Sequence, residues 1–119
     1  MRLNESIRTR TKEYGSSIIR TYVRLPKNRE EVAVLGKQML RSGTSVASHT
    51  REASRARTDS EFCSKLDVLH QEADESQLWI EFLIEDCQIT DPDLPKIHRE
   101  AGELIAIFTT IVSRVRSYL

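Results

Sequence analysis

The chain has 119 residues, of which 39% are apolar and 30% charged, and its formal net charge is zero. This length suits one domain with a single core, and the composition is too charged for a membrane protein and too apolar for a disordered one. The apolar runs are too short for a transmembrane helix or a signal peptide. We therefore expect a single domain over residues 1–119, located in the cytoplasm and without a membrane partner.

Proline and glycine divide the chain into long segments with helical periodicity, and no segment alternates in the manner of a strand. The first predicted helix spans residues 4–24 and ends before Pro26, because proline disfavours the helical conformation of the residue that precedes it. A second helix is predicted over residues 28–53. Asn28 is expected to cap it, with Glu31 completing a capping box three residues later.

Small side chains gather along the second predicted helix. They are Gly36, Ser42, Gly43, Ser45, Ala47 and Ser48. Such residues allow a neighbouring helix to approach closely. The alternative is that Gly43 only bends the helix.

The third predicted helix starts at Thr58, which forms a capping box with Glu61. Its apolar stripe consists of Phe62, Leu66, Leu69, Ala73, Ile80, Leu83 and Cys87. A fourth helix starts near Pro92, and its stripe consists of Ile97, Ala101, Leu104, Ile105, Phe108, Ile111, Val112, Val115 and Tyr118. Four helices with short connections predict an all-α fold, an antiparallel up-down-up-down four-helix bundle. Two cysteines 24 positions apart on one helix, Cys63 and Cys87, are too distant for a disulfide.

Charge is divided unevenly between the two halves of the chain. Residues 1–57 contain 13 Lys/Arg and 5 Asp/Glu, a net charge of +8, whereas residues 58–119 contain 5 and 13, a net charge of −8. Basic helices that pack beside acidic helices within one bundle account for this division. A basic face that meets nucleic acid, or a basic half that meets the acidic half of another subunit, accounts for it equally well.

Several segments together resemble a known family. They are SGTSVASHTREA (residues 42–53), SRAR (54–57), Glu61-Phe62, Lys65-Leu66 and EADESQLWIE (72–81). In order and spacing they resemble the bacterial four-helix-bundle family that is named after proteins encoded in intervening sequences of 23S ribosomal RNA genes. The resemblance extends over nearly the whole chain.

The resemblance implies a four-helix bundle that assembles as a homopentamer and has no assigned activity. A related branch, the accessory protein of diversity-generating retroelements, is strongly basic and binds nucleic acid and a reverse transcriptase. The present chain differs from that branch in its zero net charge. It also has His49 where the family usually has asparagine, and Ala47 where glycine or proline is usual.

One candidate interface combines the second and third predicted helices. Its residues are Arg51, Glu52, Glu72, Glu75 and Trp79. Glu72, Glu75 and Trp79 follow one another at steps of three and four and so share a helix face. Arg51 or Arg55 is expected to meet Glu72 or Glu75 at a subunit or helix–helix interface, with Trp79 as an apolar anchor. The alternative is a solvated acidic face with a tryptophan packed at its edge.

The candidate nucleic-acid contacts are five cations, namely Lys27, Arg29, Arg51, Arg55 and Arg57. They would act by neutralising phosphate charge, so binding should weaken steeply with salt. Few aromatic side chains lie among them, which disfavours base stacking. The alternative is that they are ordinary solvated side chains near helix ends.

An enzymatic role is not expected. His49, His70 and His98 fall on three different predicted helices, and the chain has neither a Cys-x-x-Cys nor a His-Glu-x-x-His motif. We expect no catalytic, cofactor-binding or metal-binding residues. The sequence favours a non-enzymatic homo-oligomeric assembly or interaction protein, with an accessory nucleic-acid-binding protein as the alternative.

Overall fold

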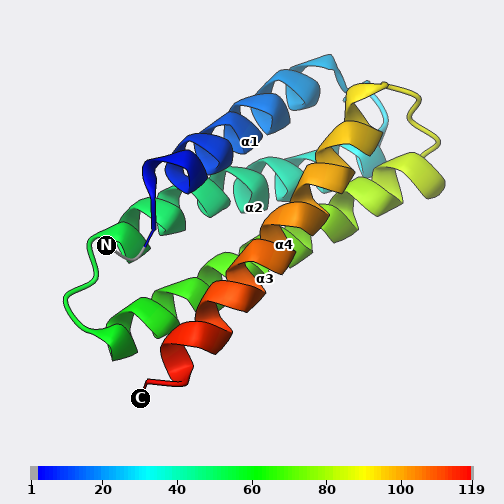
Figure 1. Ribbon diagram of the computed structural model, residues 1–119. Coiled ribbons are helices and arrows are strands. Elements are labelled where there is room, and N and C mark those ends of the chain that lie inside the picture. The colour runs from blue at the N-terminus through cyan, green and yellow to red at the C-terminus, as the bar shows by residue number, and fades with distance from the viewer. Residues whose placement is uncertain (1–2, 119) are drawn as a thin grey trace.

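A computed structural model describes residues 3–118 as four helices packed side by side, 48 × 20 × 20 Å in overall extent. The helices are α1 (Glu5–Arg24), α2 (Glu30–Ser54), α3 (Asp59–Glu85) and α4 (Asp93–Arg116). Each runs antiparallel to the one before it (Figure 1). Helix α2 packs against both α1 and α3, and α4 packs closely on α3 but only loosely on α1. The predicted all-α four-helix bundle is confirmed.

Two helix starts follow the expected capping chemistry. The Asn4 side chain accepts a hydrogen bond from the backbone N–H of Ile7 (2.9 Å), and Thr58 Oγ1 accepts one from the N–H of Glu61 (3.0 Å). The Glu61 carboxylate accepts a bond from the N–H of Arg57 (3.2 Å), one residue before the predicted partner. Both helices therefore begin with satisfied backbone donors.

The predicted start of the second helix was wrong. Arg29, and not Asn28, is the N-cap of α2, and within residues 3–118 no side chain accepts a hydrogen bond at that cap. The N–H of Arg29 bonds to the carbonyl of Pro26 (3.2 Å), which closes a turn over residues 26–29. This turn occupies Asn28, so the helix starts after it.

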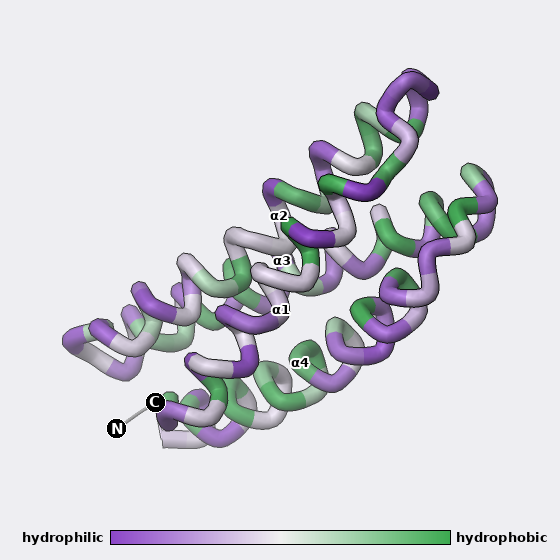
Figure 2. The backbone as a smooth tube through the Cα atoms, turned by 90° about the horizontal axis from the view of Figure 1, so that it is seen from above, coloured by the Kyte–Doolittle hydropathy of each residue, from purple (hydrophilic) through white to green (hydrophobic). Residues whose placement is uncertain are grey.

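Apolar side chains of all four helices meet in one core. The largest fully buried ones include Phe62, Phe108, Ile18 and Met39. Figure 2 shows hydrophobic and hydrophilic residues alternating along each helix, as amphipathic packing requires. Tyr118, which the pattern placed on the core stripe, is exposed because α4 ends at Arg116. None of the described helices combines the length and the apolar character needed to cross a membrane.

Helices α1 and α2 approach closely at their glycines. A methyl group on Gly43 would lie 2.7 Å from Ile18 Cγ1, and one on Gly15 would lie 3.8 Å from the Cα atom of Thr44. Gly43 of α2 therefore serves close helix packing, which was the first of the two interpretations. The two glycines therefore differ in whether they can be replaced by alanine. Only at Gly43 would the added methyl group lie too close to its neighbour.

A buried hydrogen bond crosses the bundle from α1 to α3. Tyr14 Oη lies 2.7 Å from Ser76 Oγ, which in turn donates to the carbonyl of Ala73 (2.8 Å). Tyr14 is therefore the donor to Ser76. Burial raises the pKa of Tyr14 to about 12, because the phenolate would lose its hydration.

Two arginines of α1 form ionic contacts with α4 and with the segment before it. Arg24 binds Asp91 (2.8 Å) and Asp93 (2.7 Å), and Arg10 binds the Glu100 carboxylate (2.6 Å). The Arg24 guanidinium lowers the pKa of Asp91. Cations of α1 thus pair with carboxylates from the second half of the chain, so part of the uneven charge is neutralised within the bundle.

Replacing Gly43 with alanine should destabilise the bundle by about 1–3 kcal/mol, because the methyl group would overlap Ile18. Gly15→Ala is the matched control. It has room for the methyl group and should stabilise by about 0.5–1 kcal/mol through helix propensity. Urea unfolding followed by circular dichroism measures both values. Equal effects of the two substitutions would show that the close approach at Gly43 is not required.

The stability of the protein should depend on alkaline pH through Tyr14. Its folded-state pKa is raised to about 12, so its contribution is fully present below the ordinary tyrosine pKa of about 10 and is lost as the pH rises to about 12. Tyr14→Phe should cost about 1 kcal/mol at neutral pH and should make the decline between these pH values shallower. Urea unfolding at a series of pH values compares the wild type with Tyr14→Phe. If the free energy of unfolding fell equally with pH in both proteins, Tyr14 would not be the group responsible.

Candidate functional site

Six cations line two adjoining hollows at the end of the bundle where α1 and α3 begin and α2 ends. They are Arg8, Lys12, Arg51, Arg55, Arg57 and Lys65, and we call them the basic surface. One hollow, of about 540 Å³, lies between α1 and α2, and the other, of about 610 Å³, lies between α2 and the start of α3. Both include Lys12, Ala47, Arg51 and Arg55, so they form a continuous concave surface.

Local structure explains why the arginines converge there. Arg51 and Arg55 are four residues apart at the end of α2, which places them on one face, and Arg57 follows in the connection to α3. The C-terminal end of a helix carries partial negative charge, which favours cations in the last turn. The small side chain of Ala47, which faces both hollows one turn earlier, leaves space above it.

The carboxylate nearest to Arg51 in sequence, that of Glu52, is already engaged. The Glu52 carboxylate bonds to His49 Nδ1 (2.6 Å) and lies 3.7 Å from Lys65 Nζ. The bond with His49 and the nearby ammonium lower the pKa of Glu52. By contrast, the side chains of Arg51 and Arg55 form no ion pair or hydrogen bond with any described residue. They remain available to an anionic ligand.

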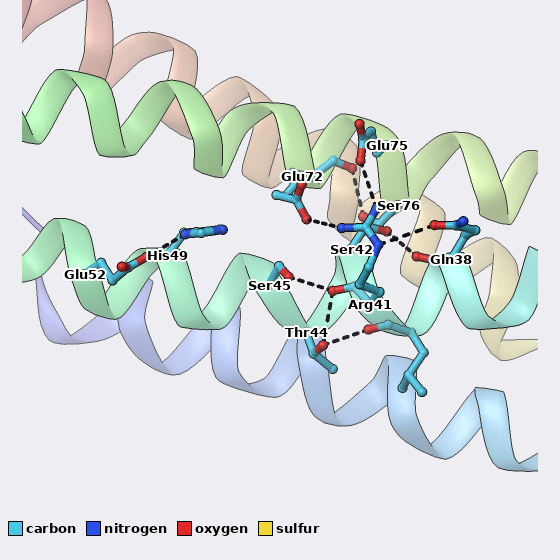
Figure 3. Close-up of polar contacts among 12 residues, drawn as sticks. Gln38, Arg41, Ser42, Thr44, Ser45, His49, Glu52, Glu72, Glu75 and Ser76 are labelled. Carbon is cyan, nitrogen blue, oxygen red and sulfur yellow. Dashed lines mark hydrogen bonds and ion pairs between the residues drawn. The ribbon is translucent and has the colours of Figure 1, made fainter.

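A separate ionic cluster lies near the middle of α2 and α3. The Arg41 guanidinium reaches Glu72 and Glu75, both at 3.4 Å, and Gln38 Oε1 accepts a further bond from Arg41 Nε (3.3 Å). Figure 3 shows Arg41 between these three side chains. The cluster joins two neighbouring helices at the surface of the bundle.

The helix–helix pairing of Arg51 or Arg55 with Glu72 or Glu75 was wrong for contacts within the chain. The antiparallel register of α2 and α3 places Arg41 opposite these carboxylates, and Arg51 lies ten residues farther along, about 15 Å away on the helix axis. A contact of Arg51 with these carboxylates in another subunit stays a prediction.

Trp79 packs mainly within its own chain. Its ring is half-buried and lies 6.2 Å from the ring of Phe82, with an angle of 37° between the ring planes. The indole Nε1 is buried and has no hydrogen-bond acceptor among the described residues. The five predicted interface residues therefore fall into two groups: Arg51 and Glu52 lie at the basic end, and Glu72, Glu75 and Trp79 lie at mid-helix.

Lys27 and Arg29 lie at the opposite end of α2 from the basic surface. Lys27 Nζ donates to the carbonyls of Tyr22 (2.8 Å) and Val23 (3.1 Å), which are left open at the end of α1. Arg29 donates to the carbonyl of Cys87 (3.0 Å). The structure therefore does not bring these two cations together with Arg51, Arg55 and Arg57, and it gives both of them capping contacts.

The histidines are likewise dispersed. His70 Nε2 lies 3.1 Å from Thr109 Oγ1, and His98 Nε2 lies 2.8 Å from a Glu81 carboxylate oxygen, so each of these two histidines links α3 to α4. Within residues 3–118, no three His, Cys, Asp or Glu side chains lie close enough together to hold a metal ion.

The sequence interpretation missed three residues that the structure makes important, namely Arg41, Lys12 and Lys65. Arg41 organises the carboxylate cluster, and the two lysines extend the basic surface. The pairing of Glu52 with Lys65 sets the antiparallel register of α2 against α3. In that register Arg41 lies beside Glu75. Local sequence patterns do not determine that register.

The whole fold is similar to that of known proteins. A solved crystal structure from Bacteroides thetaiotaomicron, of a protein with unknown function from the S23 ribosomal protein family, matches with a TM-score of 0.80 and 30% identity. The match covers 89% of this chain and 97% of that one. No curated protein matches the chain. The family model described as 23S rRNA-intervening sequence protein matches residues 5–110, and the chain belongs to that family.

Proposed function

We propose that the protein is a non-enzymatic assembly module that forms a homo-oligomer, a pentamer as the family resemblance implies. The observation that carries this proposal is the number of large apolar side chains left on the outside of the bundle. Five of them lie on two helices, Ile19 and Val23 on α1 and Val68, Leu78 and Phe82 on α3. They lie outside the hydrophobic core, so the packing of one chain leaves them uncovered, and a second surface would cover them.

The ionic clusters support a structural rather than a catalytic role. Glu72 and Glu75 both accept bonds from one guanidinium, that of Arg41. This arrangement suits joining two helices, whereas acid–base catalysis needs a carboxylate or histidine poised beside a substrate.

Light scattering at low and high salt tests the assembly. The expected result is a mass near five times the 13.7 kDa of the chain. The exposed apolar side chains should hold the assembly together in high salt, whereas a contact made by opposed charges alone would dissociate because salt screens it. A monomeric mass at both salt concentrations would contradict the proposal.

We also propose, as the second candidate, that the basic surface binds nucleic acid. The observation that favours it is specific: Arg51 and Arg55 face two adjoining hollows without an internal partner, beside Lys12, Arg57 and Lys65. Phosphate groups of a nucleic-acid backbone are strong acceptors for guanidinium groups. Such binding would follow charge and not base sequence.

Gel-shift titrations with single-stranded and duplex RNA, at several salt concentrations, test this second candidate. Arg51→Glu with Arg55→Glu should weaken binding at least about tenfold and reduce the salt slope by about two, one for each lost cation. Lys96→Glu with Arg99→Glu, on α4 at the other end of the bundle, is the charge-matched control. Equal weakening in both double variants, or the absence of binding at low salt, would exclude the basic surface as the site.

A further inference from the structure

Helix α1 carries a second stripe in addition to the one that faces the core. Lys12, Ser16, Ile19 and Val23 follow one another at steps of four, three and four, which places them on one face. Ile19 is 47% exposed and Val23 is 69% exposed. We call these four residues the α1 outer stripe; its second half is apolar and faces solvent.

Helix α3 carries a matching stripe. Val68, Gln71, Glu75, Leu78 and Phe82 also alternate steps of three and four, and we call them the α3 outer stripe. Leu78 is 42% exposed and Phe82 is 36% exposed, and Phe82 contacts the ring of Trp79. The spacing in both stripes is that of helices that pack against another helix along a seam.

The two stripes face different sides of the bundle. Helices α1 and α3 lie diagonally across it, since each packs on α2 and α4, and the described backbones of α1 and α3 do not approach each other. A symmetric dimer would cover only one stripe, because both subunits of such a dimer use the same surface. A head-to-tail contact, with the α1 stripe of one copy on the α3 stripe of the next, covers both.

The apolar halves of the stripes lie at the same level along the bundle. The Tyr14–Ser76 hydrogen bond fixes the level of α1 against α3, which run in the same direction. Ile19 lies five residues beyond Tyr14 and Leu78 two beyond Ser76, a difference of about 4.5 Å, less than one helical turn. A head-to-tail contact between level surfaces adds no rise along the bundle axis, so repeated contacts form a flat ring, and not a rising helical filament, where the rotation between copies closes.

Charge indicates that the occupant of each stripe is a second copy of this chain. The α1 stripe begins with the cation Lys12, and Arg20, which also binds Glu13 (2.9 Å), lies beside Ile19. Three carboxylates lie along the same part of α3 as Leu78 and Phe82, namely Asp74, Glu81 and Glu85, of which Glu81 binds His98 (2.8 Å). Within residues 3–118, Asp74 and Glu85 have no ion-pair partner. An apolar seam with cations on one side and carboxylates on the other favours association of the two faces.

We infer that the subunits of this protein associate head to tail, with Ile19 and Val23 of α1 packing on Leu78 and Phe82 of α3 in the neighbouring copy. The inference rests on the homo-oligomer proposed above and specifies its contact surface. It predicts a closed ring of bundles with parallel axes.

The test uses the full chain with Val23→Glu on one stripe and Leu78→Glu on the other. Each substitution would bury an unpaired charge in the contact and should weaken association by about 100-fold or more, which gives monomers in light scattering. Val34→Glu is the matched control: Val34 is 55% exposed on α2, outside both stripes, and its substitution should leave the mass unchanged. Circular dichroism checks that all three variants remain helical.

Mixing the two defective variants distinguishes the head-to-tail arrangement from a symmetric one. The Val23→Glu chain keeps an intact α3 stripe and the Leu78→Glu chain an intact α1 stripe, so the mixture should form dimers while each variant alone stays monomeric. A mixture that stays monomeric would overturn the head-to-tail contact. Wild-type mass in both variants, or dissociation by Val34→Glu as well, would place the interface elsewhere and leave the oligomer intact as a proposal. A monomeric wild type would overturn both.

Discussion

The close approach of α1 to α2 is the constraint on which the rest of the bundle depends. Because Gly43 has no side chain, Ile18 packs directly onto the backbone of α2, and Gly15 brings α1 close to Thr44. The seam between α1 and α4 is wider, since few of their residues approach each other closely. Long polar side chains fill that seam, as in the Arg10–Glu100 pair, and a hollow of about 300 Å³ remains between the two helices.

Pairing within the chain accounts for much of the opposite charge of the two halves, but not for all of it. Arg10 and Arg24 bind carboxylates of α4 and the segment before it, and Arg41 binds two carboxylates of α3. These pairs are at least partly exposed, so each contributes little to stability. The charge left over is localised. The cations Arg51 and Arg55 remain at the basic surface, and carboxylates remain on the outer side of α3, where Asp74 and Glu85 lie.

Features that depend on a few neighbouring residues were predictable from the sequence, and features that depend on helix register were not. The Thr58 cap and the buried stripe from Phe62 to Cys87 follow from local spacing, and the structure confirms both. The Asn28 cap failed because a turn closed by Pro26 competes for the same residues. Arg41 was missed as the partner of Glu75 because the two are far apart in the chain and only the packing of α2 on α3 aligns them. The convergence of Lys12 with Arg51 is hidden for the same reason.

The two proposed surfaces are compatible in one assembly. The apolar halves of the outer stripes lie in the second half of α1 and of α3, whereas the basic surface lies where those helices begin. In a ring of bundles with parallel axes, every copy therefore presents its basic surface at the same end. Neighbouring basic surfaces would then bind one polyanion together. Once one surface has bound, the next surface of the same ring is held close to the polyanion, so overall binding is stronger than that of one surface alone. Assembly would thus convert a weak, charge-based site on one chain into a multivalent site. A single bundle has zero net charge and only one such surface.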